Sequence, residues 1–330
     1  MAEEDEVLKR YLSDDERYAD LINGVSFGGR PVVCAEDLSD RDTQTGYHKN
    51  TRTVKGKKNT KYRDLFRKAS FGANFAVIGV ENQKQVHYLM PVRCMEYDVK
   101  EYQRQEVEKK RELERETTLA KNQGIIQAET SNSAEFLSGF PKDGKLHPCI
   151  TIVLYYGDDW NGSTDLHGLM DFTGIPEELQ GMVNNYKINL LDIKKLKRTD
   201  MFHTDLKQVF DAIRCDKDKN AFKMLLEKDP AYKTIRKDAY DVITAFTKSK
   251  ELMQLEESME GETVNMYKAL QDWAAEEREE GREEGIALGK IEQQLVNLRA
   301  LMTNMRLSAE KAMDVLNVPL EERAQYMELM

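Results

Sequence analysis

Two carboxylates, Asp64 and Glu81, flank a turn in the segment 61–83, KYRDLFRKASFGANFAVIGVENQ. Gly72 and Asn74 favour a tight turn, and the apolar run that follows them is typical of a strand. Antiparallel pairing about a turn centred just after Gly72 places Asp64 directly opposite Glu81. Opposed residues have Cβ atoms ~4.5–5.5 Å apart, where two like charges destabilise the sheet. The pair therefore indicates a bound divalent cation.

Gln83 is the third member of this group. Side chains alternate along a strand, so Glu81 and Gln83 are predicted on one face and Asn82 on the other. The pattern is an acid on one arm of a hairpin and an acid-x-polar sequence on the other. Mg²⁺ held by carboxylates lowers the pKa of its water and neutralises phosphate charge, which is the chemistry that phosphodiester hydrolysis requires.

The pattern resembles the active-site motif of the PD-(D/E)XK nucleases. The surrounding words are similar, in order, to the Rpn family of recombination-promoting nucleases, often labelled PD-(D/E)XK nuclease family transposases. They are RYADLING at 17–24, KYRD at 61–64, IGVENQ at 78–83, MPVRCMEYD at 90–98, the pair Tyr102 and Gln105, and later NLLDIKKL and FHTDLKQVF.

The resemblance implies a Mg²⁺-dependent DNA endonuclease, with Mn²⁺ able to substitute, linked to recombination, mobile elements or defence. Asp64 and Glu81 would be the metal ligands, with the backbone carbonyl of Asn82 as a third. Gln83 stands where the motif normally has lysine. Glutamine can hydrogen-bond a water or a phosphate oxygen, but it carries no charge.

Two further residues enter through the same resemblance. Asp20 resembles an additional acid that acts on the metal through water. Gln105 resembles the polar residue of the helix after the hairpin, which touches substrate or stabilises the residue at the lysine position. Together with Asp64, Glu81 and Gln83, they form the predicted catalytic set.

Each acid also has an ordinary structural explanation. Asp64 could cap its strand or pair with Arg67, and Glu81 could pair with Arg93 or Lys84. Lys84 does not replace the missing lysine, because it points to the opposite face of a regular strand.

The elements that must position these residues follow the order α, β, β, β, α, β. Ser13 and Glu16 form a capping box that opens a helix to about residue 23. A short strand, PVV, precedes the hairpin. Pro91 marks a break before a long helix at 94–122, and ITIVLYY at 150–156 is typical of a strand buried on both faces. The predicted fold class is α/β, with a PD-(D/E)XK restriction-endonuclease-like core (αβββαβ mixed sheet) and a helical C-terminal extension.

We divide the chain into a nuclease-like core at 1–175, a helical cover at 176–265, a Glu/Gly-rich charged helix or linker at 266–300, and a small helical segment at 301–330. Helices are expected at 166–172, 190–196, 205–213, 217–226 and 232–255. Glycines at 281, 285 and 289 leave open a close-packing stripe, a homo-oligomer through this tail, or a solvated helix.

Charge is unevenly distributed along a chain of formal net charge -10. The segment 41–70 holds ten lysines and arginines against two acids, whereas 251–290 holds twelve acids against four bases. A phosphate backbone would approach the basic segment. The predicted DNA-binding residues are Lys55, Lys57, Lys58, Lys61, Arg63, Arg67 and Lys68.

The four cysteines are scattered without a CxxC pair, which argues against a zinc site and a disulfide framework. The acidic N-terminus has no hydrophobic segment, and no apolar run approaches ~18 residues, so no membrane association and a cytoplasmic location are expected. An alternative to the endonuclease is a catalytically inactive PD-(D/E)XK-like scaffold that binds nucleic acid or protein.

Overall fold

The computed structural model describes residues 2–41, 65–72, 74–122, 133–249, 252–253 and 261–329. Over these ranges the fold is α/β, built on a five-stranded mixed sheet with strand order β1-β2-β3-β4-β5. The strands are β1 (Leu38–Asp40), β2 (Leu65–Phe71), β3 (Asn74–Gln83), β4 (Cys149–Tyr155) and β5 (Asn189–Asp192). β1, β2 and β3 pair antiparallel, whereas β3, β4 and β5 pair parallel.

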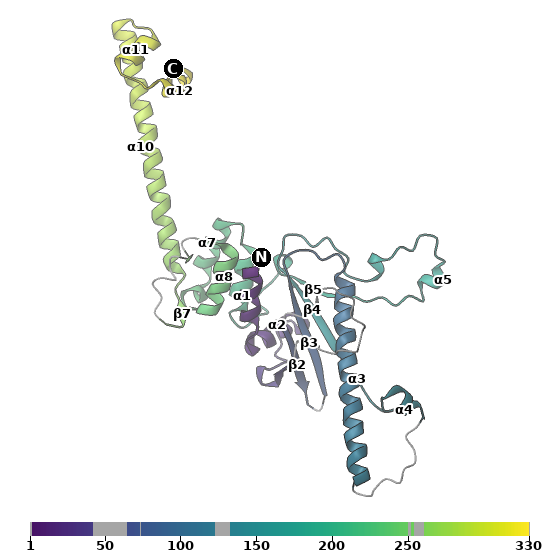
Figure 1. Ribbon diagram of the computed structural model, residues 1–330. Helices are drawn as coiled ribbons and strands as arrows, with labels where there is room; N and C mark the ends of the chain where they lie inside the picture. The colour runs from purple at the N-terminus through teal and green to yellow at the C-terminus, as the bar shows by residue number, and fades with distance from the viewer. Residues whose placement is uncertain are drawn as a thin grey trace, which may run out of the picture.

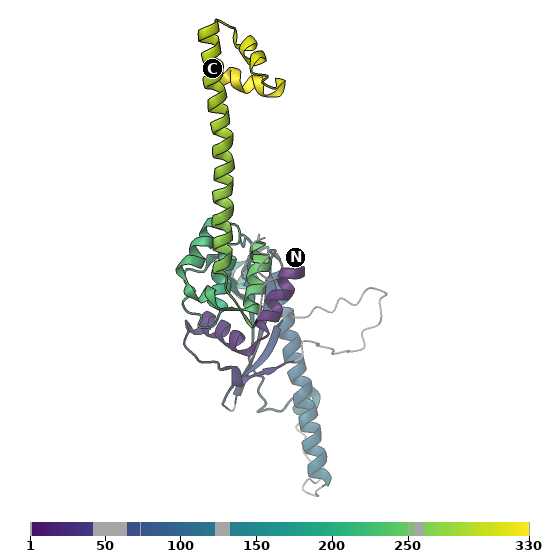
Figure 2. The ribbon, with the colours of Figure 1, turned by 90° about the vertical axis from the view of Figure 1, so that its left-hand side faces the viewer.

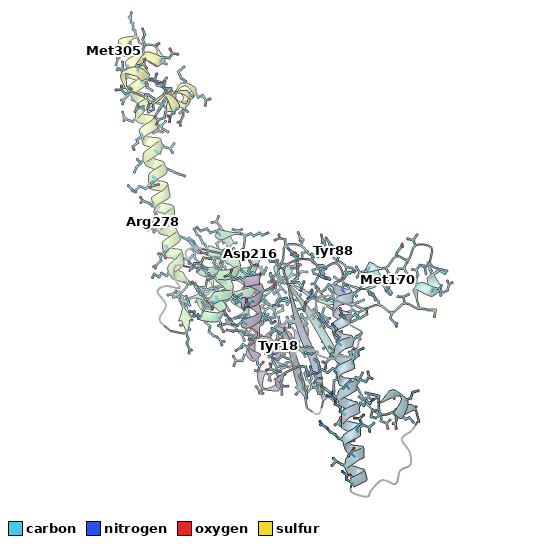
Figure 3. All side chains as sticks on the ribbon, viewed as in Figure 1. Tyr18, Tyr88, Met170, Asp216, Arg278 and Met305 are labelled. Atoms are coloured by element: carbon cyan, nitrogen blue, oxygen red, sulfur yellow. The ribbon has the colours of Figure 1, made fainter. Side chains whose placement is uncertain are left out.

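Helices cover both faces of the sheet (Figure 1). On one face α3 (Met90–Asn122) packs through Met90 and Cys94 against Val153 of β4. The opposite face is buried under the main core. The helices that contribute to this core include α1 (Ala2–Leu12), α2 (Asp15–Phe27), α6 (Leu206–Arg214) and α8 (Lys237–Thr247). Tyr18 of α2, labelled in Figure 3, donates a hydrogen bond to the carbonyl of Ile78 in β3.

The hairpin forms as its turn chemistry predicts. Phe71 of β2 pairs with Asn74 of β3 across a two-residue loop, and Gly72 has φ of +62°. A positive φ carries little steric cost for glycine, which explains its position in this turn. The predicted register is therefore confirmed throughout the described part of the hairpin.

The helix that the capping box predicts is α2, and it begins one residue later than expected. Asp14, not Ser13, is the N-cap, and its side chain accepts a hydrogen bond from the backbone N–H of Arg17. Ser13 instead donates to the carbonyl of Arg10, near the end of α1. The helix α1 was not anticipated from the sequence.

The predicted strand at Pro31–Val33 is wrong. Asn23 of α2 accepts hydrogen bonds from the backbone N–H groups of Val32 and Val33, and its amide donates to the carbonyl of Val33. The side chain therefore supplies the partners that a neighbouring strand would supply, and β1 forms further along the chain at Leu38–Asp40.

The long helix and the buried strand are confirmed, with earlier starts at Met90 and Cys149. Pro91 lies in the first turn of α3, where a missing N–H costs nothing, so it begins a helix rather than interrupting one. The predicted helix at 190–196 is wrong at its start, because Asn189–Asp192 forms β5 and only Ile193–Lys195 makes a 3-10 turn. The sheet thus extends past the predicted core boundary at residue 175.

The helical cover is partly confirmed. α6 and α7 (Lys219–Lys228) match the predicted helices, whereas 166–172 contains only the 3-10 turn His167–Leu169. The predicted helix at 232–255 is shorter: α8 is preceded by the 3-10 turn Pro230–Lys233 and by β6 (Ile235–Arg236), which pairs with β7 (Thr263–Val264).

The C-terminal helix α10 (Tyr267–Met305) projects away from the body (Figure 2). Its far end packs with α11 (Ala309–Val315) and α12 (Leu320–Leu329) around a separate small core that includes Leu298, Met313 and Tyr326. A Cβ added at Gly281, Gly285 or Gly289 would meet no atom of the described residues within 4 Å. Among the residues that the structure describes, nothing therefore packs closely against these glycines.

Two smaller helices, α4 (Ser133–Ser138) and α5 (Glu177–Gln180), lie in connections outside the sheet. Among the described residues, no helix combines the length and apolar character needed to cross a membrane. All four cysteines are free thiols.

Candidate active site on the α3 face of the sheet

The side chain of Glu81 lies on the face that α3 covers and is 1 % exposed. Its Oε1 atom accepts hydrogen bonds from Nε2 of Gln83 at 3.2 Å and from the hydroxyl of Tyr97 at 3.4 Å. The guanidinium of Arg93 forms an ion pair with the same oxygen. Strand alternation brings Gln83 to this face, and the first turns of α3 bring Arg93 and Tyr97.

Arg93 is held in place by a second contact. Its Nε donates to the hydroxyl of Tyr97 at 2.8 Å, and its side chain is 23 % exposed. Of the structural alternatives for Glu81, the pair with Arg93 is therefore observed. Lys84 points to the other face of the sheet and pairs with Glu4 of α1, as strand alternation requires.

Asp64 lies outside the described residues. Leu65, the residue that follows it in the chain, pairs with Val80, which precedes Glu81 in β3. The observed register is thus the one from which a Glu81–Asp64 pair was predicted. The pair itself stays a prediction, as does the alternative pairing of Asp64 with Arg67.

Asn82 has its side chain on the opposite face from Glu81 and is 3 % exposed. It pairs with Leu154 in the parallel ladder between β3 and β4. Its backbone carbonyl as a metal ligand remains a prediction.

Asp20 is buried and is engaged by the backbone before α6. Its carboxylate accepts hydrogen bonds from the N–H groups of His203 and Thr204 and from the Thr204 hydroxyl, at 2.7–3.0 Å. No hydrogen bond within the described ranges joins Asp20 to Glu81 or Gln83. The contacts favour a structural role, since the carboxylate anchors the segment that leads into α6.

Gln105 is also buried, about three turns along α3 from Arg93. Its amide donates to the carbonyl of His147 and to Glu101, and its Oε1 accepts from the N–H of His147 at 2.7 Å. It therefore ties α3 to the segment that enters β4. The structure does not bring it into hydrogen-bonding contact with Gln83.

Of the predicted DNA-binding residues, Lys55, Lys57, Lys58, Lys61 and Arg63 lie outside the described residues. Arg67 pairs with Asp15 and Asp40, and its side chain is 13 % exposed. Its charge is thus neutralised by two carboxylates. Lys68 lies on the other face of β2, with Nζ 3.9 Å from the centre of the Phe75 ring.

Lys68 belongs to a cationic cluster around His147. The His147 ring stacks on Phe75 with ring centres 3.5 Å apart. Burial and the charges of Lys109, Lys68 and Arg41 lower the pKa of His147, because each disfavours the protonated ring. Carboxylates of α3 pair with two of these cations: Glu101 and Glu108 with Arg41, and Glu112 with Lys109.

The other parallel strands end beside Gln83. Gln83 pairs with Tyr155 of β4, and Tyr155 pairs with Asp192 of β5. Burial raises the pKa of Asp192, and the charge of Lys195, whose Nζ lies 3.7 Å away, offsets only part of this. Asp192 was not among the predicted site residues, because residues 190–196 were expected to form a helix.

The oxygen donors of Glu81 and Gln83 are of the kind that Mg²⁺ prefers. The described residues supply only part of a site, since no three His, Cys, Asp or Glu side chains in them lie close enough together to hold a metal ion. Asp64 would have to provide the second carboxylate. A cation at Glu81 would also have to share or displace the guanidinium of Arg93.

Comparisons of the chain with protein-family models, with curated proteins and with solved structures found no match.

Proposed function

We propose that the protein is a divalent-metal-dependent endonuclease that hydrolyses phosphodiester bonds in DNA. The observation that carries the proposal is the group formed by Glu81, Gln83 and Arg93 at the end of a hairpin whose register matches the predicted one. Attack on a phosphate requires groups that stabilise its developing charge. The acid, the neutral hydrogen-bonding amide and the cation on this face of the sheet are groups of that kind.

The topology supports the same proposal. The order α2, β1, β2, β3, α3, β4 is the order expected of a PD-(D/E)XK core, and β1 to β4 are neighbours in that order within the sheet. Fold alone does not carry an activity, so the proposal depends on the side chains.

In the proposed reaction, water adds to phosphorus and one P–O bond breaks, which leaves a phosphate monoester and a hydroxyl. Mg²⁺ bound by Asp64 and Glu81 would activate the water and neutralise charge on the phosphate. Gln83 would orient the water or a phosphate oxygen through its amide. Arg93 would supply the positive charge that lysine provides elsewhere, because its guanidinium lies against the carboxylate to which Gln83 donates.

Basic side chains near the sheet edge would hold the DNA backbone. Lys68, Arg41 and Lys109 belong to this group in the described residues, and Lys55, Lys57, Lys58, Lys61 and Arg63 are proposed to extend it. Arg41 and Arg67 are weaker candidates, since Glu101 and Glu108 already neutralise Arg41, and Asp15 and Asp40 already neutralise Arg67. Roles in recombination, mobile-element movement or defence are proposals that follow from the Rpn resemblance.

A second candidate function is a nucleic-acid-binding scaffold that does not cleave. The ion pair between Glu81 and Arg93 favours it, because a guanidinium neutralises the carboxylate without any metal. Calorimetric titration with Mn²⁺ separates the two. The endonuclease requires binding that is lost in Glu81→Gln, whereas the scaffold requires salt-dependent DNA binding without metal binding at Glu81.

The direct test of the endonuclease is nicking of supercoiled plasmid in Mg²⁺ by the wild type, Asp64→Asn and Glu81→Gln. Activity in the wild type alone supports the proposal. Equal activity in all three proteins would rule it out.

A further inference from the structure

A hollow of about 400 Å³ lies at the carboxyl ends of the parallel strands, on the face of the sheet opposite Glu81. Residues that follow each strand line it: Lys84 after β3, Gly157 after β4 and Lys194 after β5. Glu4 of α1 and the end of α8 complete the wall. Ligands of open α/β sheets bind in crevices outside the carboxyl ends of strands, so the location itself is suited to binding.

A second hollow, of about 290 Å³, continues from the first. The two share Asp216, Lys217, Thr247 and Lys248, and the second adds Lys219. Asp216 is labelled in Figure 3. Together the hollows are comparable in size with small-ligand pockets.

Lysines outnumber carboxylates around both hollows. The larger has four lysines (Lys84, Lys194, Lys217, Lys248) against three acids (Glu4, Asp158, Asp216), and the smaller has Lys217, Lys219 and Lys248 against Asp216 alone. This excess of positive charge is local, since the whole chain carries -10. The surplus favours an anionic ligand.

The lysines at the mouth are only weakly committed. Lys217 and Lys248 line both hollows, and their side chains are 69 % and 67 % exposed. Lys217 pairs with Asp158, and Lys248 pairs with Glu4 at 3.2 Å. The Lys217–Asp158 pair is exposed at both ends, and such pairs contribute ~0–1 kcal/mol, so an incoming anion can take over the Lys217 ammonium group at small cost. Glu4 is only 6 % exposed, but it also pairs with Lys84, so it keeps a cationic partner when Lys248 turns to an anion.

Lys194 lines the larger hollow and is held in place by two ion pairs. Its side chain is 15 % exposed, and its Nζ lies 2.8 Å from Asp216 and 3.4 Å from Asp158. Asp158, one of the two carboxylates that hold Lys194, also accepts a hydrogen bond from Lys217, so the network keeps these two ammonium groups close together.

We propose that these joined hollows form a phosphate-binding site, separate from the group around Glu81, in which Lys217 and Lys248 are the principal ligands. A phosphate group carries several oxygens and more than one negative charge, so it can engage both ammonium groups at once. The phosphate could come from the end of a nucleic-acid strand or from a free polyphosphate. The site does not depend on the proposed endonuclease activity.

The test is isothermal titration of the full chain with pyrophosphate and with a 5′-phosphorylated oligonucleotide, with divalent metal chelated. The double variant Lys217→Gln and Lys248→Gln should bind at least about tenfold more weakly than the wild type, because a charge-assisted hydrogen bond contributes ~1.5 kcal/mol or more. The matched control, Lys228→Gln with Lys237→Gln, alters two exposed lysines outside the hollows and should bind as the wild type does.

Binding of the 5′-phosphorylated strand but not of its 5′-hydroxyl form or pyrophosphate would support the site and assign it to strand ends. Binding of pyrophosphate would support a site for free polyphosphate. Failure of the wild type to bind either probe, or equal affinity in the lysine double variant, would overturn the proposal. Because metal is chelated, neither result depends on cleavage.

Discussion

The guanidinium of Arg93 pairs with Oε1 of Glu81, the same oxygen to which the amide of Gln83 donates. One acid, one amide and one cation thus meet, two of them from β3 and one from α3. In the motif that the sequence resembles, lysine on the strand provides the cation. We propose that Arg93 of α3 provides it in this protein.

We predict that Arg93→Gln lowers Mg²⁺-dependent plasmid nicking by roughly 10²-fold, since removing one donor that stabilises transition-state charge typically costs that much. Adding Gln83→Lys to this variant should recover much of the activity, because the lysine restores a positive charge on the same face of the sheet. Full activity in Arg93→Gln, or no recovery in the double variant, would contradict this role.

The control for Arg93 lies two turns further along the same side of α3. Lys100 of α3 pairs with Glu96 near the protein surface, with a side chain that is 32 % exposed. Lys100→Gln should leave nicking unchanged. Thermal unfolding of each variant shows whether a loss of nicking comes from lost catalysis or from a loss of folded protein.

Asp20→Ala should act on stability rather than on chemistry. The carboxylate satisfies the N–H groups of His203 and Thr204, and leaving such buried donors unpaired costs ~1–3 kcal/mol each. We expect a lower free energy of unfolding in urea and unchanged nicking per folded molecule. Unchanged stability with lost nicking would instead assign Asp20 to the metal site.

Arg17→Met should destabilise the fold by ~3 kcal/mol. Arg17 is 1 % exposed and binds Asp205 and Asp238 through paired hydrogen bonds. Its removal leaves these two carboxylates beside the core without the guanidinium that neutralises them. Arg10→Met is the matched control, since Arg10 is 67 % exposed and its ion pair with Asp241 is long, at 3.6 Å. Equal urea midpoints for the two variants would refute the prediction.

The same cluster predicts a pH dependence. Arg17 and Arg236 outweigh the effect of burial and lower the pKa of Asp238 from 3.8 to about 2. A carboxylate with a lowered folded-state pKa stabilises the fold above its ordinary pKa, and this contribution is lost as pH falls through the folded value. The stability difference between the wild type and Asp238→Asn should therefore shrink between about pH 5 and about pH 2. A constant difference would show that the charge of Asp238 is not responsible.

The tail should be separable from the body. Trp273 at the base of α10 is 1 % exposed within the main core, whereas Leu298 and Tyr326 belong to the separate distal core. Trp273→Ala should cost ~3–5 kcal/mol, and ending the chain after residue 289 should leave the unfolding of the body unchanged. A large loss of stability on truncation would show that the distal core supports the body.

A deeper truncation, which ends the chain after residue 275 and removes all three glycines of α10, tests the predicted homo-oligomer. A Cβ added at Gly281, Gly285 or Gly289 would meet no atom of the described residues within 4 Å, so this side of α10 is open to a second copy of the chain. Light scattering of the full and shortened proteins should then show a larger assembly only for the full chain. Equal masses would exclude association through the tail.

Local chemistry determined what could be predicted. The hairpin register follows from a two-residue loop with glycine at positive φ, which depends on adjacent residues only. The helix start was missed by one residue because Ser13 and Asp14 are both good caps, and the carbonyl of Arg10 engages Ser13.

Features that depend on distant partners were not predictable. Val32 and Val33 have strand-like composition, yet Asn23 from α2 satisfies their backbone. NLLD forms β5 because β4 lies beside it, although its sequence also fits a helix. The pair of Glu81 with Arg93 was one of two alternatives in the sequence, and only the placement of α3 selects it.

Plasmid nicking with Mg²⁺ by the wild type beside Glu81→Gln tests the central claim most directly. We predict clear nicking by the wild type and a loss of at least about 10²-fold in Glu81→Gln, because the carboxylate would hold the metal that activates water. A wild type that does not nick, or a variant that nicks equally well, would contradict the account.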